Sequence, residues 1–378
     1  MGWREVSVAE QRREFVMLAS LEGANVSSLC RRFGISRQTG HLWLRRYAAG
    51  EEAFADRSRR PQYSPERVDE AVEAQILAVR DAHPAWGARK IAAVLRRSGT
   101  QPPAISSIHA VLRRHGRVTP DSPGRAYGRF ERATPNELWQ MDFKGRVLLA
   151  NGDWLYPFTV IDDHSRFALE LGACANQQTQ TVKNRLEMAL RHHGLPEAIY
   201  VDNGSPWGGG QPGRWTPLRV WLLKLGIWTI YATPYHPQGR GKNERLHGTM
   251  DAEVFDLVRL RDFDEAQAAL DHWRHVYNHE RPHQSLDFAT PSERYQCSIR
   301  TFPATLPSPQ YDEGEIVRRV DKTKGYVSFR HRLWRTPEAF AGETVAIRPR
   351  LPDGHFAICF GAYEIAIIDL NEPESSPE

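Results

Sequence analysis

The sequence predicts a multidomain protein with two α-helical domains, an α/β domain built on a mixed sheet, and a small all-β domain, in that order. Three observations predict this. Apolar residues recur at helical spacing in two separate stretches before residue 118. Strand-like runs that alternate with helices begin at Thr134. Short strands and turns fill residues 311–370. With 378 residues, the chain is long enough for several domains.

Charge is distributed unevenly along the chain. Residues 1–133 carry 23 basic and 14 acidic side chains, a net charge of +9, whereas the remainder has a net charge of −5. A basic front part indicates a polyanionic partner, although a well-solvated surface explains the same charges equally well. The sequence has neither an apolar run long enough for a membrane helix nor a signal-peptide pattern, so we expect a cytoplasmic protein.

Residues 1–50 have the pattern of a helix-turn-helix domain. Ser7 and Glu10 form a capping box before a helix that extends to about residue 22. A short helix follows Asn25, and Ser36 begins a third helix. The exposed side of the third helix then presents side chains suited to base edges and phosphates, namely Arg37, Gln38, His41 and Arg45. A three-helix packing module with solvated arginines is the alternative.

A second domain of the same kind follows a basic linker. Residues 51–63 lack periodicity and hold a cluster suited to a phosphate backbone or a minor groove, Arg57, Arg59 and Arg60. Residues 64–117 predict helices over 66–82, after 87 and over 105–115. The reading face of this second helix-turn-helix domain would carry Ser106, Ser107, His109 and Arg113. Residues 118–133 form a second basic linker.

Residues 134–300 predict the α/β domain. Strands are expected over 138–143, 154–161 and 167–171, and Asn151–Gly152 is a turn signal between the first two. Then come a helix over 179–192, a strand over 198–201, a glycine-rich loop over 205–217, a helix over 218–225 and a strand over 227–231. A long helix begins near residue 239, and the last helix covers 263–278.

Residues 301–370 predict a small barrel or sandwich, and we expect a small β-barrel. Its basic side chains suit either nucleic acid or protein contacts, and the sequence leaves both open: Arg318, Arg319, Lys322, Lys324, Arg330, Arg332 and Arg335. Residues 371–378 form an acidic tail without apolar content, which we expect to be disordered. The four cysteines have no metal-ligand spacing and are expected to be reduced.

Three carboxylates stand out by their positions. Asp142 lies in the first expected strand of the α/β domain, Asp202 ends a later strand, and Glu244 lies in the first turn of the long helix. Side chains at strand ends and helix starts gather at one edge of a sheet. Converging carboxylates repel each other unless cations neutralise them, and such oxygen ligands suit Mg²⁺ or Mn²⁺. Acidic residues at strand ends are common in soluble domains, so the positions alone do not establish a metal site.

Basic side chains near these carboxylates are candidates for DNA contacts. Lys242 and Arg245 share a helix face and could hold phosphates, with a solvated helix as the alternative. His236 lies in a proline-bracketed loop, where a DNA contact and a loop role are equally well supported. The adjacent pair Asp162 and Asp163 is expected to form a structural turn.

Five motifs occur in a specific order: WQMDFK, VIDDHSRF, YVDNGSPW, TPYHPQGRGKNERLHGTM and YNHERPHQSLDFATPSERY. Together they closely resemble the catalytic core shared by bacterial insertion-sequence transposases and retroviral integrases. The resemblance covers about residues 134–296. The tandem helix-turn-helix domains before the core and the β-domain after it are similar to those of single-chain transposases of the integrase type.

The resemblance implies a ribonuclease-H-like fold and a catalytic and metal-binding triad, matched here by Asp142, Asp202 and Glu244. It implies two Mg²⁺ or Mn²⁺ ions per active site, with Asp142 bridging both. The implied partners are double-stranded DNA, both terminal inverted repeats and target, and further copies of the chain in a homodimer or homotetramer. The 41 residues between Asp202 and Glu244 exceed the usual family spacing, and the glycine-rich loop accounts for the excess.

The resemblance thus implies a DNA transposase that cleaves and joins strands. Two alternatives remain at this point. A catalytically silent, sequence-specific DNA-binding repressor would keep the fold without needing three converging carboxylates. A nuclease on the same fold would cut DNA without joining it.

Overall fold

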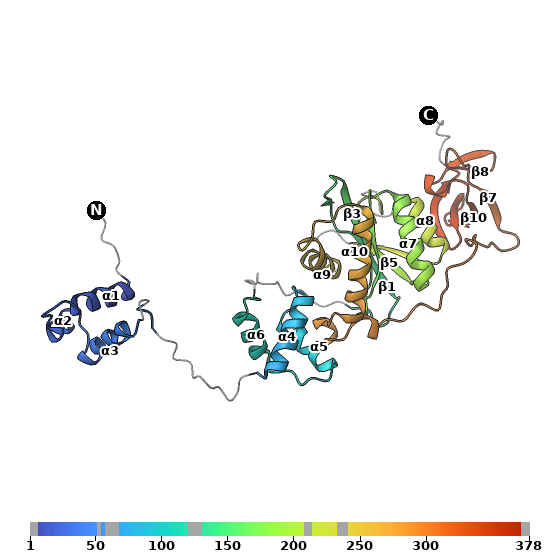
Figure 1. Ribbon diagram of the computed structural model, residues 1–378. Coiled ribbons are helices and arrows are strands. Elements are labelled where there is room, and N and C mark those ends of the chain that lie inside the picture. The colour runs from blue at the N-terminus through green and yellow to red at the C-terminus, as the bar shows by residue number, and fades with distance from the viewer. Residues whose placement is uncertain are drawn as a thin grey trace, which may run out of the picture. The chain divides into compact units, whose positions relative to one another are not determined.

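The structure is a computed structural model that describes residues 7–50, 54–56, 68–118, 131–207, 214–232 and 241–371 (Figure 1). The chain divides into two compact units, Met1–Arg67 and Val68–Glu378. Most of both predicted linkers, the middle of the glycine-rich loop and nearly all of the acidic tail lie outside the described residues.

The described residues of the first unit form three helices, α1 (Val8–Ala19), α2 (Val26–Arg32) and α3 (Arg37–Ala48). Ser7, Asn25 and Ser36 cap them, each accepting a hydrogen bond from the backbone N–H three residues later. Phe15, Cys30 and Trp43 lie in the core. This layout agrees with the predicted helix-turn-helix domain. The first helix ends at Ala19, earlier than predicted, and Gly23 turns the chain with a φ of +79°.

The second unit begins with another three helices, α4 (Glu70–Ala82), α5 (Ala88–Arg97) and α6 (Ile105–Arg114). Ile76, Ile91 and Ile108 are fully buried between them. The predicted start of the first of these helices at residue 66 is wrong, because Val68 and Asp69 are not helical. Instead Asp69 caps α4, and its carboxylate accepts a hydrogen bond from Ala71 N at 2.9 Å.

These helices contact the α/β domain directly. Arg97 at the end of α5 forms an ion pair of 2.5 Å with Glu293 and donates a second hydrogen bond, of 3.0 Å, to the carbonyl oxygen of Phe288. Glu293 ends a short 3-10 helix, Pro291–Glu293, that follows another one at Gln284–Leu286. The second helical domain is therefore anchored on the same unit as the sheet.

The α/β domain is built on a mixed sheet of β1 (Leu138–Phe143), β2 (Val147–Leu148), β3 (Trp154–Asp162), β4 (Ala168–Cys174), β5 (Ala198–Val201) and β6 (Trp228–Tyr231). β4, β3 and β1 are antiparallel neighbours, whereas β1, β5 and β6 run parallel. This strand order confirms the predicted mixed sheet and is that of a ribonuclease-H-like fold. The Asn151–Gly152 turn joins β3 to β2, a two-residue strand that was not predicted.

Helices cover both faces of this sheet (Figure 1). Trp139 and Met141 of β1 pack toward α7 (Thr179–His193) and α8 (Pro217–Lys224). The opposite face packs against α9 (Gly241–Met250) and α10 (Phe263–His275). Both of these helices continue as π-helical turns, Asp251–Phe255 and Val276–Glu280. The central strand β3 contributes to both layers, with Phe158 and Val160 in the first and Leu155 and Ile161 in the second.

The C-terminal residues form two antiparallel sheets. One contains β7 (Ile316–Arg319), β10 (Thr344–Arg350), β11 (His355–Phe360) and β12 (Tyr363–Asp369), and the other is the hairpin of β8 (Tyr326–Phe329) and β9 (Arg332–Arg335), with a 3-10 turn at Glu338–Phe340. Between residues 301 and 371 no strand pairing joins the two sheets, so closure into a barrel stays a prediction. Val220 and Lys224 of α8 anchor this domain, the latter by a 2.8 Å ion pair with Glu343.

Gly40 lies at a close contact between helices of the first unit. A Cβ there would lie 2.6 Å from Cys30 Sγ and 2.9 Å from Phe15 Cζ. We expect Gly40→Ala to destabilise this unit, because overpacking costs about 1–3 kcal/mol, against about 1 kcal/mol gained from helix propensity. Hydrogen exchange of the α1–α3 amides in the full chain measures this.

Gly248 of α9 provides the matched control, because a Cβ there would meet no atom within 4 Å. Gly248→Ala should leave exchange in α9 unchanged or slower. Equal protection of α1–α3 in Gly40→Ala and in the wild type would contradict the close contact.

Candidate active site and DNA-binding helices

The parallel pairing of β1 with β5 sets the positions of two predicted site residues. Leu138 pairs with Ala198 and Gln140 with Tyr200. The same register, continued by two residues, places Asp142 level with Asp202, which directly follows β5. Neighbours in register share a face of the sheet, so both carboxylates belong to the same side of its edge.

Local hydrogen bonds orient both carboxylates. Asp142 Oδ1 accepts a hydrogen bond from Phe143 N at 2.8 Å, and Asp202 Oδ1 accepts one from Gly204 N at 2.9 Å. A Cβ at Gly204 would lie 3.1 Å from Asp202 Oδ1, so the chain turns closely around this carboxylate. Both aspartates are half-buried and remain accessible from the sheet edge.

Glu244, the third predicted ligand, is exposed in the first turn of α9. Leu246 and Met250 of the same helix are buried against the sheet. Within the described part of the chain, no group of three or more His, Cys, Asp and Glu side chains is placed to hold a metal ion. The structure thus brings Asp142 and Asp202 to neighbouring strand ends, and the triad stays a prediction.

A contact that the sequence did not predict links α9 to the strand that carries Asp142. His247 Nε2 lies 3.0 Å from Thr159 Oγ1, and Thr159 is paired opposite Asp142 on β3. The Thr159 hydroxyl donates to the carbonyl oxygen of Asp142 at 3.1 Å. Burial lowers the pKa of His247 to about 4, so the imidazole is neutral at pH 7. The only sequence signal was the position of His247 one turn after Glu244.

The pair Asp162–Asp163 is structural, as predicted. Both are fully buried. Asp162 accepts hydrogen bonds from Asn136 N, Ser165 N and Ser165 Oγ at 2.6–2.8 Å. Burial raises the pKa of the Asp162 carboxyl, and these donors oppose the rise. Because buried donors already surround both carboxylates, neither is a ligand candidate.

Lys242 and Arg245 have different surroundings. Lys242 Nζ lies 2.5 Å from Asp163 Oδ1, and only 13% of the Lys242 side chain is exposed. Burial, with the nearby charge of Arg166, lowers the pKa of Lys242 to about 8. Arg245 is exposed. The structure thus gives Lys242 a partner inside the protein, whereas Arg245 lies at the surface.

The predicted reading faces are exposed. On α3 the side chains of Arg37, Gln38, His41 and Arg45 all face solvent. On α6 Ser106, His109 and Arg113 are exposed and Ser107 is half-buried. Four further predicted DNA contacts lie outside the described residues: Arg57, Arg59, Arg60 and His236.

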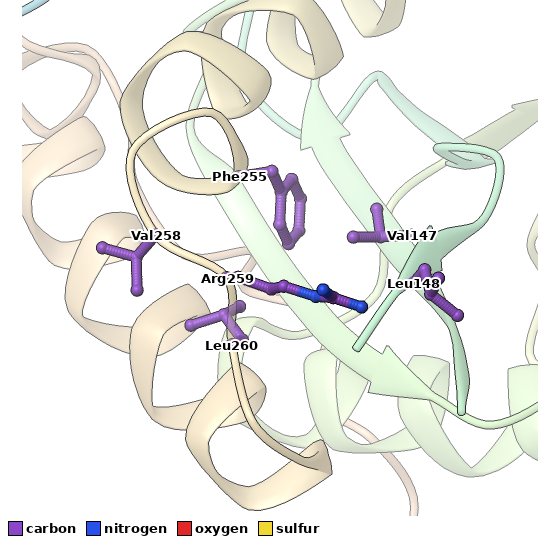
Figure 2. Close-up of a pocket in the computed structure, with 6 residues that line it drawn as sticks. All are labelled: Val147, Leu148, Phe255, Val258, Arg259 and Leu260. Carbon is purple, nitrogen blue, oxygen red and sulfur yellow. The ribbon is translucent and has the colours of Figure 1, made fainter. Parts of the chain in front are cut away.

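An apolar hollow elsewhere on the unit contains none of the predicted site residues. It lies between β2 and the segment before α10 (Figure 2). Its lining consists of Val147, Leu148, Phe255, Val258, Arg259 and Leu260. None of the helices in the described residues has the length and the apolar composition that crossing a bilayer requires.

Several family models match the chain in order. Two models described as integrase core domain match residues 132–237 and 225–291. A helix-turn-helix domain matches residues 11–62, and a homeodomain-like domain matches residues 39–112. The C-terminal domain of the IS481 family of transposases matches residues 315–376. These matches cover the two helical domains, the mixed-sheet domain and the C-terminal sheets.

Similar proteins come from bacterial insertion elements. The chain is 26% identical over 285 residues to an uncharacterized 31.7 kDa protein of insertion element IS407 from Burkholderia multivorans, which covers 73% of this chain and 93% of that protein. It is 24% identical over 322 residues to an uncharacterized 39.2 kDa protein of insertion element IS476 from Xanthomonas euvesicatoria. This match covers 82% of this chain and 84% of that protein.

Solved structures of retroviral integrases are also similar. A chain of the simian T-cell lymphotropic virus intasome is 14% identical with a TM-score of 0.40, covering 80% of this chain and all of that one. The HTLV-2 integrase catalytic core domain in complex with magnesium is 14% identical with a TM-score of 0.33, and the match covers 43% of this chain and 99% of that one. In the order of its family matches and in its insertion-element relatives, the chain is similar to bacterial insertion-sequence transposases of the integrase type.

Proposed function

We propose that this chain is a DNA transposase that binds the terminal inverted repeats of an insertion sequence, cleaves DNA at those ends and joins them to target DNA. The observation that carries the proposal is the level placement of Asp142 and Asp202 at the ends of neighbouring parallel strands in an integrase core. The bacterial cytoplasm, where such DNA lies, is the proposed location.

Asp142, Asp202 and Glu244 are the side chains proposed to hold Mg²⁺ or Mn²⁺. Carboxylate oxygens are the ligands that both ions prefer. The first two carboxylates are accessible at the sheet edge, whereas the buried Asp162 and Asp163 are occupied by internal donors. When bound, two ions per site would activate the attacking oxygen and stabilise the leaving oxygen.

The proposed reaction has two steps. Water attacks a phosphodiester at the element's end, breaks one P–O bond and frees a 3′-hydroxyl. That hydroxyl then attacks a phosphodiester of the target strand and displaces its 3′ oxygen, so each bond that breaks is replaced by one that forms. The chain's own contribution is to hold the ends, the target and the carboxylates in one geometry. Two ends must meet, which favours a homodimer or homotetramer.

The exposed side chains of α3 and α6 are the proposed DNA-reading faces. Arg113 and Arg245 would contact phosphates, and the two linkers would add further contacts. The β-domain, with its proposed barrel closure, would use its basic side chains to contact either DNA or a neighbouring copy. Phosphate contacts supply affinity, whereas base-edge contacts supply the choice of sequence.

Asp142→Asn tests the active site. We expect the rates of cleavage and joining to fall at least about 100-fold. Even the mutation of a residue that only hydrogen-bonds to a metal ligand lowers metal affinity or activity about 10- to 100-fold. DNA affinity should be unchanged. A gel assay with Mg²⁺ and duplexes bearing the element's ends measures both steps.

Asp271→Asn, which alters an exposed carboxylate of α10, is the matched control. If the wild type and Asp142→Asn behave alike, the chain is a non-enzymatic DNA-binding protein such as a repressor. If cut product appears without joined product, it is a nuclease.

Arg37→Ala and Arg45→Ala test the reading face of α3. We expect each variant to weaken binding to the terminal repeats and to reduce the slope of log affinity against log salt by about 1, because each arginine would displace one counterion. Fluorescence anisotropy across a salt titration of the full chain measures the slope.

Arg46 lies on the same helix but packs over the Trp43 ring, 4.7 Å from its centroid. Arg46→Ala should therefore leave the slope unchanged. Unchanged slopes for the Arg37 and Arg45 variants would refute phosphate contacts by α3.

A further inference from the structure

A buried ion pair fixes the start of α9. Lys242 Nζ lies 2.5 Å from Asp163 Oδ1, and it also donates a hydrogen bond of 3.0 Å to the carbonyl oxygen of Asp163. The Asp163 side chain is fully buried and 13% of the Lys242 side chain is exposed. A hydrogen bond between two charged groups is shorter and stronger than one between neutral groups. Removing either partner of this buried pair would leave the other charge uncompensated, which is strongly destabilising.

Asp163 is itself tied to the strand that carries Asp142. Gln140 of β1 donates from Nε2 to Asp163 Oδ1 at 2.7 Å, and Arg132 N donates to Asp163 Oδ2 at 2.8 Å. Gln140 precedes Asp142 by two residues, and Lys242 precedes Glu244 by two residues. A continuous chain of polar contacts therefore runs from the first carboxylate's strand to the helix that carries the third.

A second set of hydrogen bonds connects the same helix to the sheet on the other side of Glu244. Thr159 donates its only hydroxyl proton to the carbonyl oxygen of Asp142 at 3.1 Å. Its oxygen therefore accepts the hydrogen bond from His247 Nε2, which carries a proton in this tautomer. α9 is thus joined to the strand of Asp142 both before and after Glu244.

We propose that Lys242 is a positioning residue, which holds Glu244 at a fixed distance from Asp142 through the ion pair with Asp163. This inference depends on the proposed function, in which Glu244 is a metal ligand. It assigns Lys242 a role different from a phosphate contact, because its ammonium group is directed to a buried carboxylate. Contacts that orient metal ligands affect metal affinity without touching the metal.

The test compares Lys242→Met with Lys242→Arg, Asp163→Asn and the double variant Lys242→Met/Asp163→Asn in the full chain. Three quantities are measured: Mn²⁺ affinity by calorimetry, single-turnover cleavage at saturating DNA with Mg²⁺, and the salt dependence of DNA binding. Lys224→Met is the matched control, because it breaks another shielded lysine–carboxylate pair, with Glu343, which joins α8 to the C-terminal domain. Thermal unfolding of each variant identifies those that fail to fold.

We expect Lys242→Met to weaken Mn²⁺ binding and slow cleavage about 10- to 100-fold, with the DNA affinity and salt slope unchanged. Lys242→Arg, which keeps the charge and the donors, should recover part of both losses. Because Lys242→Met and Asp163→Asn break the same pair, their effects should not add. Lys224→Met should retain the wild-type Mn²⁺ affinity even where its unfolding temperature falls equally.

Two results would overturn this inference alone. A flatter salt slope with unchanged Mn²⁺ affinity in Lys242→Met would make Lys242 a phosphate contact. Equal behaviour of Lys242→Met and Lys224→Met would reduce the pair to a general contribution to stability. The proposed function itself fails if the wild type binds no Mn²⁺, or if Asp142→Asn binds Mn²⁺ as tightly as the wild type does. In either case this inference fails with it.

Discussion

The parallel pairing of β1 with β5 is the interaction on which the rest of this structure depends. It is a pairing of buried strands in the middle of the sheet, and its register places Asp142 and Asp202 level at one edge. Two carboxylates so placed repel each other, and the polypeptide tolerates them because the edge remains accessible to water and cations. The apolar layers on both faces fix this edge, since Trp139 and Met141 anchor β1 on one side while α9 covers the other.

The two acidic pairs of the core differ in what surrounds them. Asp162 and Asp163 are adjacent and fully buried, yet each is satisfied by backbone amides and side-chain donors. Burying a charge is tolerable only with such partners, so this pair serves as an internal connection between strand, turn and helix. Asp142 and Asp202 are half-buried and stand where substrate can approach. Aspartate thus has a structural role in the buried pair and a proposed metal-binding role at the sheet edge.

Much of this arrangement could be predicted from the sequence because it is local. The caps at Ser7 and Ser36, the strands around Asp142 and before Asp202, and the turn at Asn151–Gly152 follow from short-range chemistry. β2 was missed because two residues carry no alternation pattern. The Lys242–Asp163 and His247–Thr159 contacts join residues 79 and 88 positions apart, so only tertiary structure brings them together. For Lys242 the sequence therefore indicated a phosphate contact, with a solvated helix residue as the alternative, and gave no sign of the pair with Asp163.

We propose that three carboxylates from two strands and one helix form a single metal-dependent site for DNA cleavage and joining. A crystal of the full chain with DNA bearing the element's ends and Mn²⁺, analysed by anomalous scattering, tests it most directly. We expect Mn²⁺ peaks in contact with oxygen atoms of Asp142, Asp202 and Glu244, beside the phosphate at the element's end. Mn²⁺ bound elsewhere, or a Glu244 carboxylate directed away from an occupied Asp142 site, would contradict it.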